Sequence, residues 1–195
     1  MTERKIRKLI MKSIPIETER LIIKYIEERD VNDMYEYASL DEVCEYLLWS
    51  PHINSDVTRG YIEHLQKRYI RGLYADWAIT LKDSGKMIGT CGYASIDSWN
   101  SVCEIGYVLS PTYQGCGYMT EAVNAVLSLT FDTIGMNKAV LRIINENARS
   151  KKLAERVGFR FDRVVWSEME IKDVMRDIAH YEMTDEEYKR KKEAV

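Results

Sequence analysis

The chain has 195 residues and a net charge of −3, from 28 Lys and Arg against 31 Asp and Glu. This length suits one globular domain, and the near-neutral charge excludes a basic field that recruits nucleic acid. With 46% hydrophobic and 30% charged residues, 3 Pro and 10 Gly, the composition excludes a disordered chain and a collagen-like repeat. No apolar run reaches the roughly 20 residues that span a bilayer, and no secretory signal pattern opens the chain, so we expect a soluble, cytoplasmic protein with no membrane or nucleic-acid partner.

Cysteine usage argues against a metal or disulfide framework. Cys44, Cys91, Cys103 and Cys116 form no CxxC pair and have no histidine at zinc-finger spacing. Three of them lie in apolar or strand-like segments, where a buried free thiol is the expected state. We therefore expect no metal site.

The first half of the chain predicts mainly helices. In the first 13 residues, Ile6, Leu9 and Ile10 alternate with basic residues at a spacing typical of an amphipathic helix. We interpret residues 1–13 as a basic amphipathic leader and residues 14–195 as a single domain, because no linker or repeat divides the rest. The elements expected next are a strand at 20–26, a helix around 31–38, a short helix before Ser50-Pro51, and a helix capped by Thr58 that ends at Gly72.

The second half predicts an antiparallel meander followed by alternating elements. Three strand-like runs, at 77–81, 87–94 and 102–109, are separated by short turns that favour hairpins. The expected fold class is α+β, with a mixed, largely antiparallel sheet of six to seven strands flanked by helices. The remaining expected elements are a helix at 120–134, a strand at 138–144, a helix at 148–157, strands at 161–165 and 178–183, and a charged tail.

One strand–loop–helix segment, from Glu104 to Glu121, carries the clearest chemical signal. Gly115 and Gly117 lie between a strand and a long helix, where unpaired N–H groups and the helix dipole favour a bound phosphate. The alternative is an ordinary glycine turn into a helix. No GK[ST] follows the glycines, so the loop is not a P-loop, and the incomplete GxGxxG disfavours a dinucleotide fold.

Several motifs, in order along the chain, resemble one known family. Gln114-Gly-Cys-Gly-Tyr-Met resembles the Q/R-x-x-G-x-G/A pyrophosphate loop of the GNAT N-acetyltransferase superfamily. Glu17-Thr-Glu-Arg-Leu resembles the opening TERL strand of its ribosomal-protein N-acetyltransferase (RimJ/RimL-like) branch, and Glu104-Ile-Gly-Tyr resembles the fourth strand of that branch. The segment 146–159 resembles its EN-x-x-S…GF segment. The resemblance spans about 17–183.

This resemblance implies an αβα-type GNAT fold whose central strands splay apart to admit acetyl-CoA, the expected cosubstrate. Backbone groups of Tyr107, Val108 and Leu109 would pair with its pantetheine arm, and Asn147 and Ser150 would lie near its thiol. The pyrophosphate would be held by the loop and the first helical turn, namely Gln114, Gly115, Cys116, Gly117, Tyr118, Met119 and Thr120.

Two positions depart from the family pattern. Met119 stands where Gly or Ala is usual, although its side chain can point away while its N–H still donates. Ala154 stands where some members carry a tyrosine acid. Ser150 or a water would therefore have to stabilise the leaving thiolate.

The implied reaction is attack of a neutral amine on the thioester. Near pH 7, deprotonation costs roughly 1 kcal/mol for an α-amine and roughly 4.6 kcal/mol for a lysine. Glu104 is the candidate base, because it shares a strand face with Gly106 and Val108. The alternative for Glu104 is an ordinary carboxylate paired with a neighbouring Lys or Arg. A backbone amide near Val108 would hold the thioester oxygen.

Three functions stay open for the chain. The first is N-acetyl transfer from acetyl-CoA to a primary amine, with a protein N-terminal α-amine as the acceptor that the resemblance favours. The second is acetylation of a small molecule such as a polyamine, aminoglycoside or amino sugar, and the third is a non-catalytic acetyl-CoA-binding sensor. Homodimers are common in the resembling family, but no sequence feature establishes one. The acceptor wall is expected to include Trp49, His52, Tyr69, Tyr74 and Trp77 with the acids Glu42 and Glu45, unless these aromatic residues simply pack the helices on the sheet.

Overall fold

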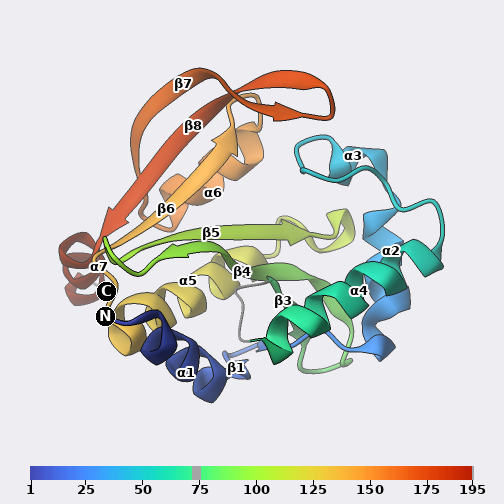
Figure 1. Cartoon of the computed structure of the whole chain (residues 1–195), viewed down its shortest axis with the longest axis horizontal. Helices are drawn as coiled ribbons and strands as arrows, with labels where there is room; N and C mark the ends of the chain where they lie inside the picture. Colours follow the sequence, from blue (N-terminus) through green and yellow to red (C-terminus); the bar gives the residue numbers. More distant parts are fainter. Residues whose placement is uncertain (72–75, 195) are drawn as a thin grey trace.

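One eight-stranded sheet forms the centre of the protein, in a computed structural model that describes residues 1–71 and 76–194. The strand order is β1-β2-β3-β4-β5-β6-β8-β7 (Figure 1). All neighbouring strands run antiparallel except β5 and β6, so the expected mixed, largely antiparallel sheet of an α+β fold is confirmed. The strands are β1 (Ile16–Glu17), β2 (Leu21–Lys24), β3 (Asp76–Leu81), β4 (Met87–Asp97), β5 (Val102–Leu109), β6 (Lys138–Ile144), β7 (Arg160–Ile171) and β8 (Val174–Thr184).

Helices cover both faces of the sheet. The α5 face is covered by α1 (Glu3–Ser13), α5 (Tyr118–Ser128), α6 (Ala148–Arg156) and α7 (Asp185–Glu193). The α4 face is covered by α2 (Val31–Ala38) and α4 (Ser55–Ile70), with the short α3 (Asp41–Cys44) between them in the chain. None of the helices in the described chain is long and apolar enough to cross a membrane.

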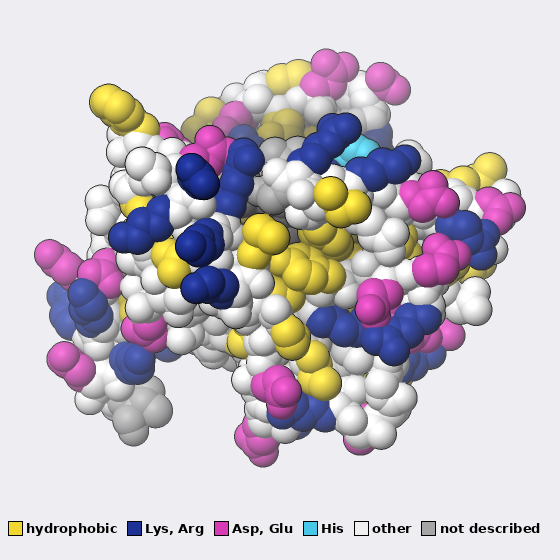
Figure 2. Space-filling model, turned by 60° about the horizontal axis from the view of Figure 1, so that its bottom comes forward, with side chains coloured by type: hydrophobic (Ala, Val, Ile, Leu, Met, Phe, Trp, Pro, Cys, Tyr) yellow, Lys and Arg dark blue, Asp and Glu magenta, His cyan; other side chains and the backbone are white. Residues whose placement is uncertain are grey.

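Alternating strand residues feed a separate apolar cluster on each face. On the α5 face, Ile105 and Leu141 pack in the larger cluster, together with Ile6 of α1. On the α4 face, Ala78 and Met87 pack in the cluster that contains residues of α2 and α4. The amphipathic spacing of the first helix is therefore used for burial, while its basic residues Arg4, Lys5, Lys8 and Lys12 stay exposed. Figure 2, in which the bottom of Figure 1 comes forward, shows clusters of Lys and Arg around hydrophobic side chains on this side of the molecule.

Several boundaries differ from the sequence prediction for local physical reasons. The sheet has one strand more than the expected maximum, because the two-residue β1 pairs with β2. Asn54, rather than Thr58, caps α4, since its side chain accepts from two first-turn N–H groups. The charged tail forms α7, which starts with a capping box between Thr184 and Glu187. The last two strands are longer than expected and join at Lys172-Asp173, whose φ values of 51° and 61° suit a tight hairpin turn.

Candidate active site

The strands β5 and β6 form a fork. Their parallel pairing joins only Val102–Glu104 to Lys138–Val140. Beyond this point β5 pairs with β4 alone, while β6 pairs with β8. Figure 1 shows the two strands diverging. Within the described chain, one edge of β5 from residue 105 to 109 therefore has no strand partner.

Alternate peptide groups of β5 face this open edge. The Ser110 N–H donates to the Ile88 carbonyl of β4 at 2.8 Å. Because facing residues of an antiparallel pair alternate between hydrogen-bonded and non-hydrogen-bonded positions, the peptide groups of Val108 also face β4. Those of Tyr107 and Leu109 face the fork. The amide expected near Val108 to hold a thioester oxygen would accordingly have to come from Tyr107 or Leu109, because the amide of Val108 itself faces β4.

A glycine loop (residues 114–117) enters α5 beside the open edge. Gly115 and Gly117 have positive φ values of 79° and 82°, which glycine adopts at no steric cost. Among the described residues no side chain caps α5, so the N–H groups of its first turn are available to a ligand. The Gln114 side chain ties the loop to β5 by donating to the Leu109 carbonyl at 3.3 Å. Met119 buries its side chain, which is 6% exposed, and so leaves the loop open.

The segment that resembles TERL clamps this loop. The Thr18 hydroxyl donates to Glu121 of α5 at 2.6 Å, and the Arg20 guanidinium donates to the same carboxylate at 2.7 Å. Arg20 also donates to the Cys116 carbonyl at 3.0 Å and lies over the Tyr118 ring. Burial acts to raise the pKa of Glu121, but these hydrogen bonds outweigh it and lower that pKa. The sequence motif marked this segment, but the part that Arg20 and Glu121 play was missed.

The start of α6 lies across the fork from β5. Asn147 caps this helix, and its side chain accepts the Ser150 N–H at 3.0 Å. The Ser150 hydroxyl is 2.8 Å from the hydroxyl of Tyr107, whose side chain points to the α5 face. Burial raises the pKa of Tyr107, so its phenol stays protonated near neutral pH. The two residues expected near the thiol therefore share one helical turn.

Glu104 lies at the fork itself, as the last β5 residue paired with β6. Its side chain is 17% exposed, and it accepts from Arg142 at 3.0 Å and from the Ser95 hydroxyl at 3.3 Å. Arg142 also lies 3.8 Å from Glu168, which pairs with His180. The arginine partner of the alternative interpretation is thus present, while a carboxylate with four lone-pair positions keeps room for another donor.

Comparison with known proteins identifies this arrangement. The family described as "Acetyltransferase (GNAT) domain" matches residues 20–160. The chain belongs to the GNAT acetyltransferase family. It is 28% identical over 171 residues to the "Uncharacterized N-acetyltransferase p20" of Bacillus licheniformis, which covers 88% of this chain and 96% of that protein. It is 23% identical over 167 residues to the "Ribosomal-protein-serine acetyltransferase" of Escherichia coli (strain K12), covering 84% and 92%. The fold matches the crystal structure of Microcin C7 self immunity acetyltransferase MccE in complex with acetyl-CoA and AMP, with a TM-score of 0.77, 22% identity, and coverage of 86% and 93%.

The aromatic wall expected in this GNAT N-acetyltransferase divides between the two sheet faces. Trp77 is 2% exposed in the cluster of the α5 face, so it is a core residue, as the alternative interpretation had it. His52 is buried and bonded to a threonine of α4, and burial lowers its pKa. Tyr74 lies outside the described residues. Glu42 and Glu45 are exposed.

Asp76 is a site candidate that sequence reasoning missed. It begins β3, half-buried, and its carboxylate accepts from the Tyr61 hydroxyl of α4 at 3.3 Å, while Tyr69 donates to its carbonyl. Burial raises the pKa of Asp76. Its register partners toward the fork are Gly92 and then Gly106, which leave that part of the sheet without side chains. No local motif marks Asp76, because its surroundings come from a helix that precedes it.

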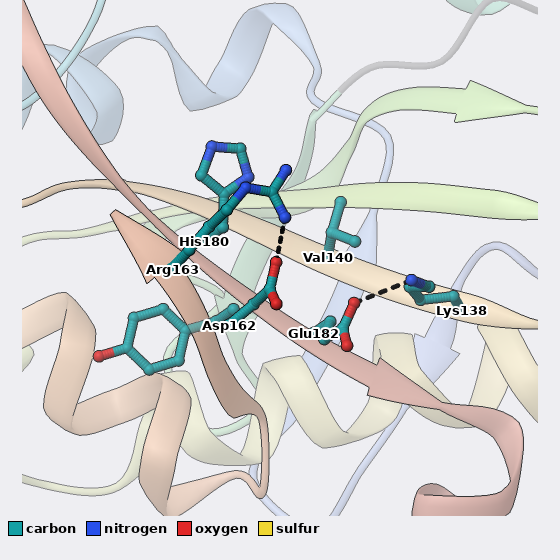
Figure 3. A pocket seen from close by; sticks show the side chains of 7 residues that line it. Lys138, Val140, Asp162, Arg163, His180 and Glu182 are labelled. Atoms are coloured by element: carbon teal, nitrogen blue, oxygen red, sulfur yellow. Dashed lines mark hydrogen bonds and ion pairs between the residues drawn. The ribbon is translucent and has the colours of Figure 1, made fainter. Parts of the chain in front are cut away.

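A hollow on the outer strands has its charges paired internally. Figure 3 shows Lys138 directed at Glu182, at 2.8 Å, and Asp162 beside Arg163. The hollow is lined by Lys138, Val140, Asp162, Arg163, His180, Tyr181 and Glu182. Nothing among the described residues groups three or more His, Cys, Asp or Glu side chains as metal ligands.

Proposed function

We propose that this GNAT enzyme transfers the acetyl group of acetyl-CoA to the α-amino group of a protein N-terminus. The observation that carries the proposal is the open edge of β5 lying beside the uncapped start of α5. An extended amide chain can add to such an edge as a further strand. An anion at its end can then bind the helix start.

The residues of the fork suit acetyl-CoA. In this proposal the peptide groups of Tyr107 and Leu109 bind the pantetheine amides. The amides from Gly115 to Thr120 bind the pyrophosphate. Gln114 and the Arg20–Glu121 clamp hold the loop in place. A substrate thioester supplies the activated acetyl group, and the protein supplies position and electrostatics.

The chemistry then needs a base and a group that stabilises the departing sulfur. Glu104 accepts the proton of the amine, directly or through one water. After this first proton has left the ammonium group, the neutral nitrogen bonds to the acetyl carbon and the carbon–sulfur bond breaks with its electron pair on sulfur. The nitrogen then loses its second proton to solvent, and the coenzyme A thiolate takes a proton from solvent. Ser150 donates a hydrogen bond to this thiolate. A serine hydroxyl is a much weaker acid than a thiol, so Ser150 stabilises the thiolate without losing its own proton.

Two arguments favour an α-amine acceptor. The Escherichia coli relative is named for acetylation of a ribosomal protein. Deprotonation near pH 7 also costs only roughly 1 kcal/mol for an α-amine, against roughly 4.6 kcal/mol for a lysine. The smaller cost is easier to meet for a carboxylate base such as Glu104, which Arg142 holds in place. A small cationic amine is the second candidate, and the half-buried carboxylate of Asp76 beside Tyr61 favours it.

Acetyl-CoA binding by calorimetry, followed by thiol release across an amine panel, tests the proposal. The panel contains peptides with N-terminal Ser or Ala, the same peptides blocked at the N-terminus but carrying an internal lysine, and polyamines and aminoglycosides. Turnover confined to free N-termini is the expected result. Preference for a polyamine or aminoglycoside would replace the acceptor, and binding without any turnover would indicate a sensor.

A further inference from the structure

The Ser150 hydroxyl is held from two sides of the fork. Its residue is fixed at the start of α6 by the Asn147 cap, and its hydroxyl meets the Tyr107 hydroxyl of β5 at 2.8 Å. No secondary-structure hydrogen bond joins β5 to β6 at Tyr107, since their pairing ends at Glu104. This contact between two side chains therefore bridges an opening that the sheet leaves unpaired.

The direction of this hydrogen bond follows from acidity. A phenol is a stronger acid than an aliphatic hydroxyl. In the 2.8 Å contact between the two hydroxyl groups, Tyr107 is therefore the donor and the Ser150 oxygen the acceptor. The second contact of the phenol, to the Ser150 carbonyl, is 3.4 Å long and weaker. When the Ser150 oxygen accepts from Tyr107, its own hydrogen is left to donate elsewhere. Donor chains of this kind polarise one another and strengthen the outer bond.

We propose that Tyr107 is a positioning residue that orients the Ser150 hydroxyl toward the sulfur atom of the departing coenzyme A. The proposal rests on the assignment of Ser150 under the proposed function. Position 154, where some family members place a tyrosine acid, holds a buried alanine, so the phenol reaches the site from β5 instead of from α6. Tyr107 itself does not give up its proton, because an ionised phenol would be half-buried without a countercharge among its described partners.

The test compares two tyrosine hydroxyls in the same sheet. Tyr107→Phe removes the positioning bond and leaves the ring and the backbone of β5. Tyr93→Phe is the matched control: the Tyr93 hydroxyl also lies 2.8 Å from a hydroxyl, but this partner, Thr130, belongs to the segment that follows α5 and not to α6. Kinetics are measured with acetyl-CoA and a peptide with N-terminal serine, or with the amine that the panel prefers, and acetyl-CoA binding is measured by calorimetry.

We expect Tyr107→Phe to lower kcat about tenfold, which one hydrogen bond of ordinary strength accounts for. The acetyl-CoA affinity and the KM for the amine should stay within about twofold of wild type. Tyr93→Phe should leave all three unchanged, even if it lowers the melting temperature. The double variant Tyr107→Phe/Ser150→Ala should be no slower than Ser150→Ala alone, because the phenol acts only through Ser150.

Three results would overturn the proposal. The first is an unchanged kcat in Tyr107→Phe, and the second is a loss that appears only in acetyl-CoA affinity. The third is a double variant in which the reductions in kcat of Tyr107→Phe and Ser150→Ala multiply. Each leaves the proposed function standing as long as the wild type binds acetyl-CoA and acetylates an amine. Failure of the wild type to do so is a separate result and removes the proposed function itself.

Discussion

Among single residues, Glu104 has two competing interpretations: a structural role in its ion pair with Arg142 and a chemical role as the general base. Its ion pair with Arg142 belongs to a chain of charged side chains that extends over four strands, since Arg142 also contacts Glu168, which pairs with His180. Such a chain stabilises the α4 face whether or not an amine ever reaches it. Its place at the end of the β5–β6 pairing distinguishes Glu104 from the other acids of this face.

Glu182 supplies a control for the substitution of Glu104. It is also 17% exposed and also pairs with basic residues, Lys138 and Arg160, but it lies on β8, on the side of β6 opposite to β5. Glu104→Gln should lower kcat about 100-fold, as expected for loss of a general base, with acetyl-CoA affinity unchanged by calorimetry. Glu182→Gln should keep full activity. Equal activity in the two variants would leave Glu104 with only its structural ion pair.

At the scale of elements, the glycine loop depends on backbone conformation as well as on open space. Gly117 and Gly135 both have a left-handed φ, 82° and 76°, so a larger residue at either position costs roughly 1–2 kcal/mol. Only Gly117 lies at the start of α5, and a Cβ there would be 3.4 Å from the Arg20 side chain. Gly117→Trp should abolish acetyl-CoA binding in calorimetry, whereas Gly135→Trp should lose similar stability and keep its affinity. Retained binding in Gly117→Trp would remove the loop from the cosubstrate site.

The clamp between the β1–β2 turn and α5 should be visible in the pH dependence of stability. The pKa of Glu121 is lowered in the folded state, so its contribution to stability is present above its unfolded pKa of about 4.3 and is lost as the pH falls through the folded value. Glu121→Gln should therefore cost about 2 kcal/mol at pH 7, and the difference from wild type should shrink below about pH 4. Urea unfolding at both pH values measures this, with the exposed Glu186→Gln as the control. A difference that stays constant with pH would contradict the ionic nature of the clamp.

Elements with a strong local signal were predictable from the sequence, and elements defined by distant contacts were not. The meander of β3, β4 and β5 and the glycine loop before α5 follow from alternation and turn residues. The full length of β7 and β8 could not be predicted, because the outer parts of both strands are polar and the two-residue turn between them contains no glycine. Asp76 stayed invisible because a tyrosine fifteen residues earlier creates its environment. The helix α7 did carry a signal, the capping box of Thr184, but only Tyr188 of that helix is buried.

Considered as a whole, the molecule brings its two halves together at the end of the sheet beyond the fork. The tip of the β7–β8 hairpin meets the α3 region, where Lys172 donates to the Cys44 carbonyl and Tyr46 packs against a small apolar cluster that includes Ile171 (Figure 1). The tip of the hairpin and the α3 region form two walls, and β4 and β5, with Gly92 and Gly106, form the floor between them. We expect the amine to bind between these two walls, so their contact should influence the acceptor and not acetyl-CoA.

Lys172→Met tests this expectation, because it removes the hydrogen bond between the β7–β8 tip and the α3 region and keeps an unbranched side chain only one atom shorter. The KM for the amine should rise about fivefold, equivalent to the loss of about 1 kcal/mol of a bond that holds the walls in register. The affinity for acetyl-CoA, measured by calorimetry, should stay constant, because the glycine loop and the open edge of β5 lie on other elements. Lys189→Met is the control, since Lys189 pairs with Asp185 within α7. If the KM for the amine is unchanged in Lys172→Met, the acceptor does not depend on these walls, and the route to Glu104 must start from another side of the fork.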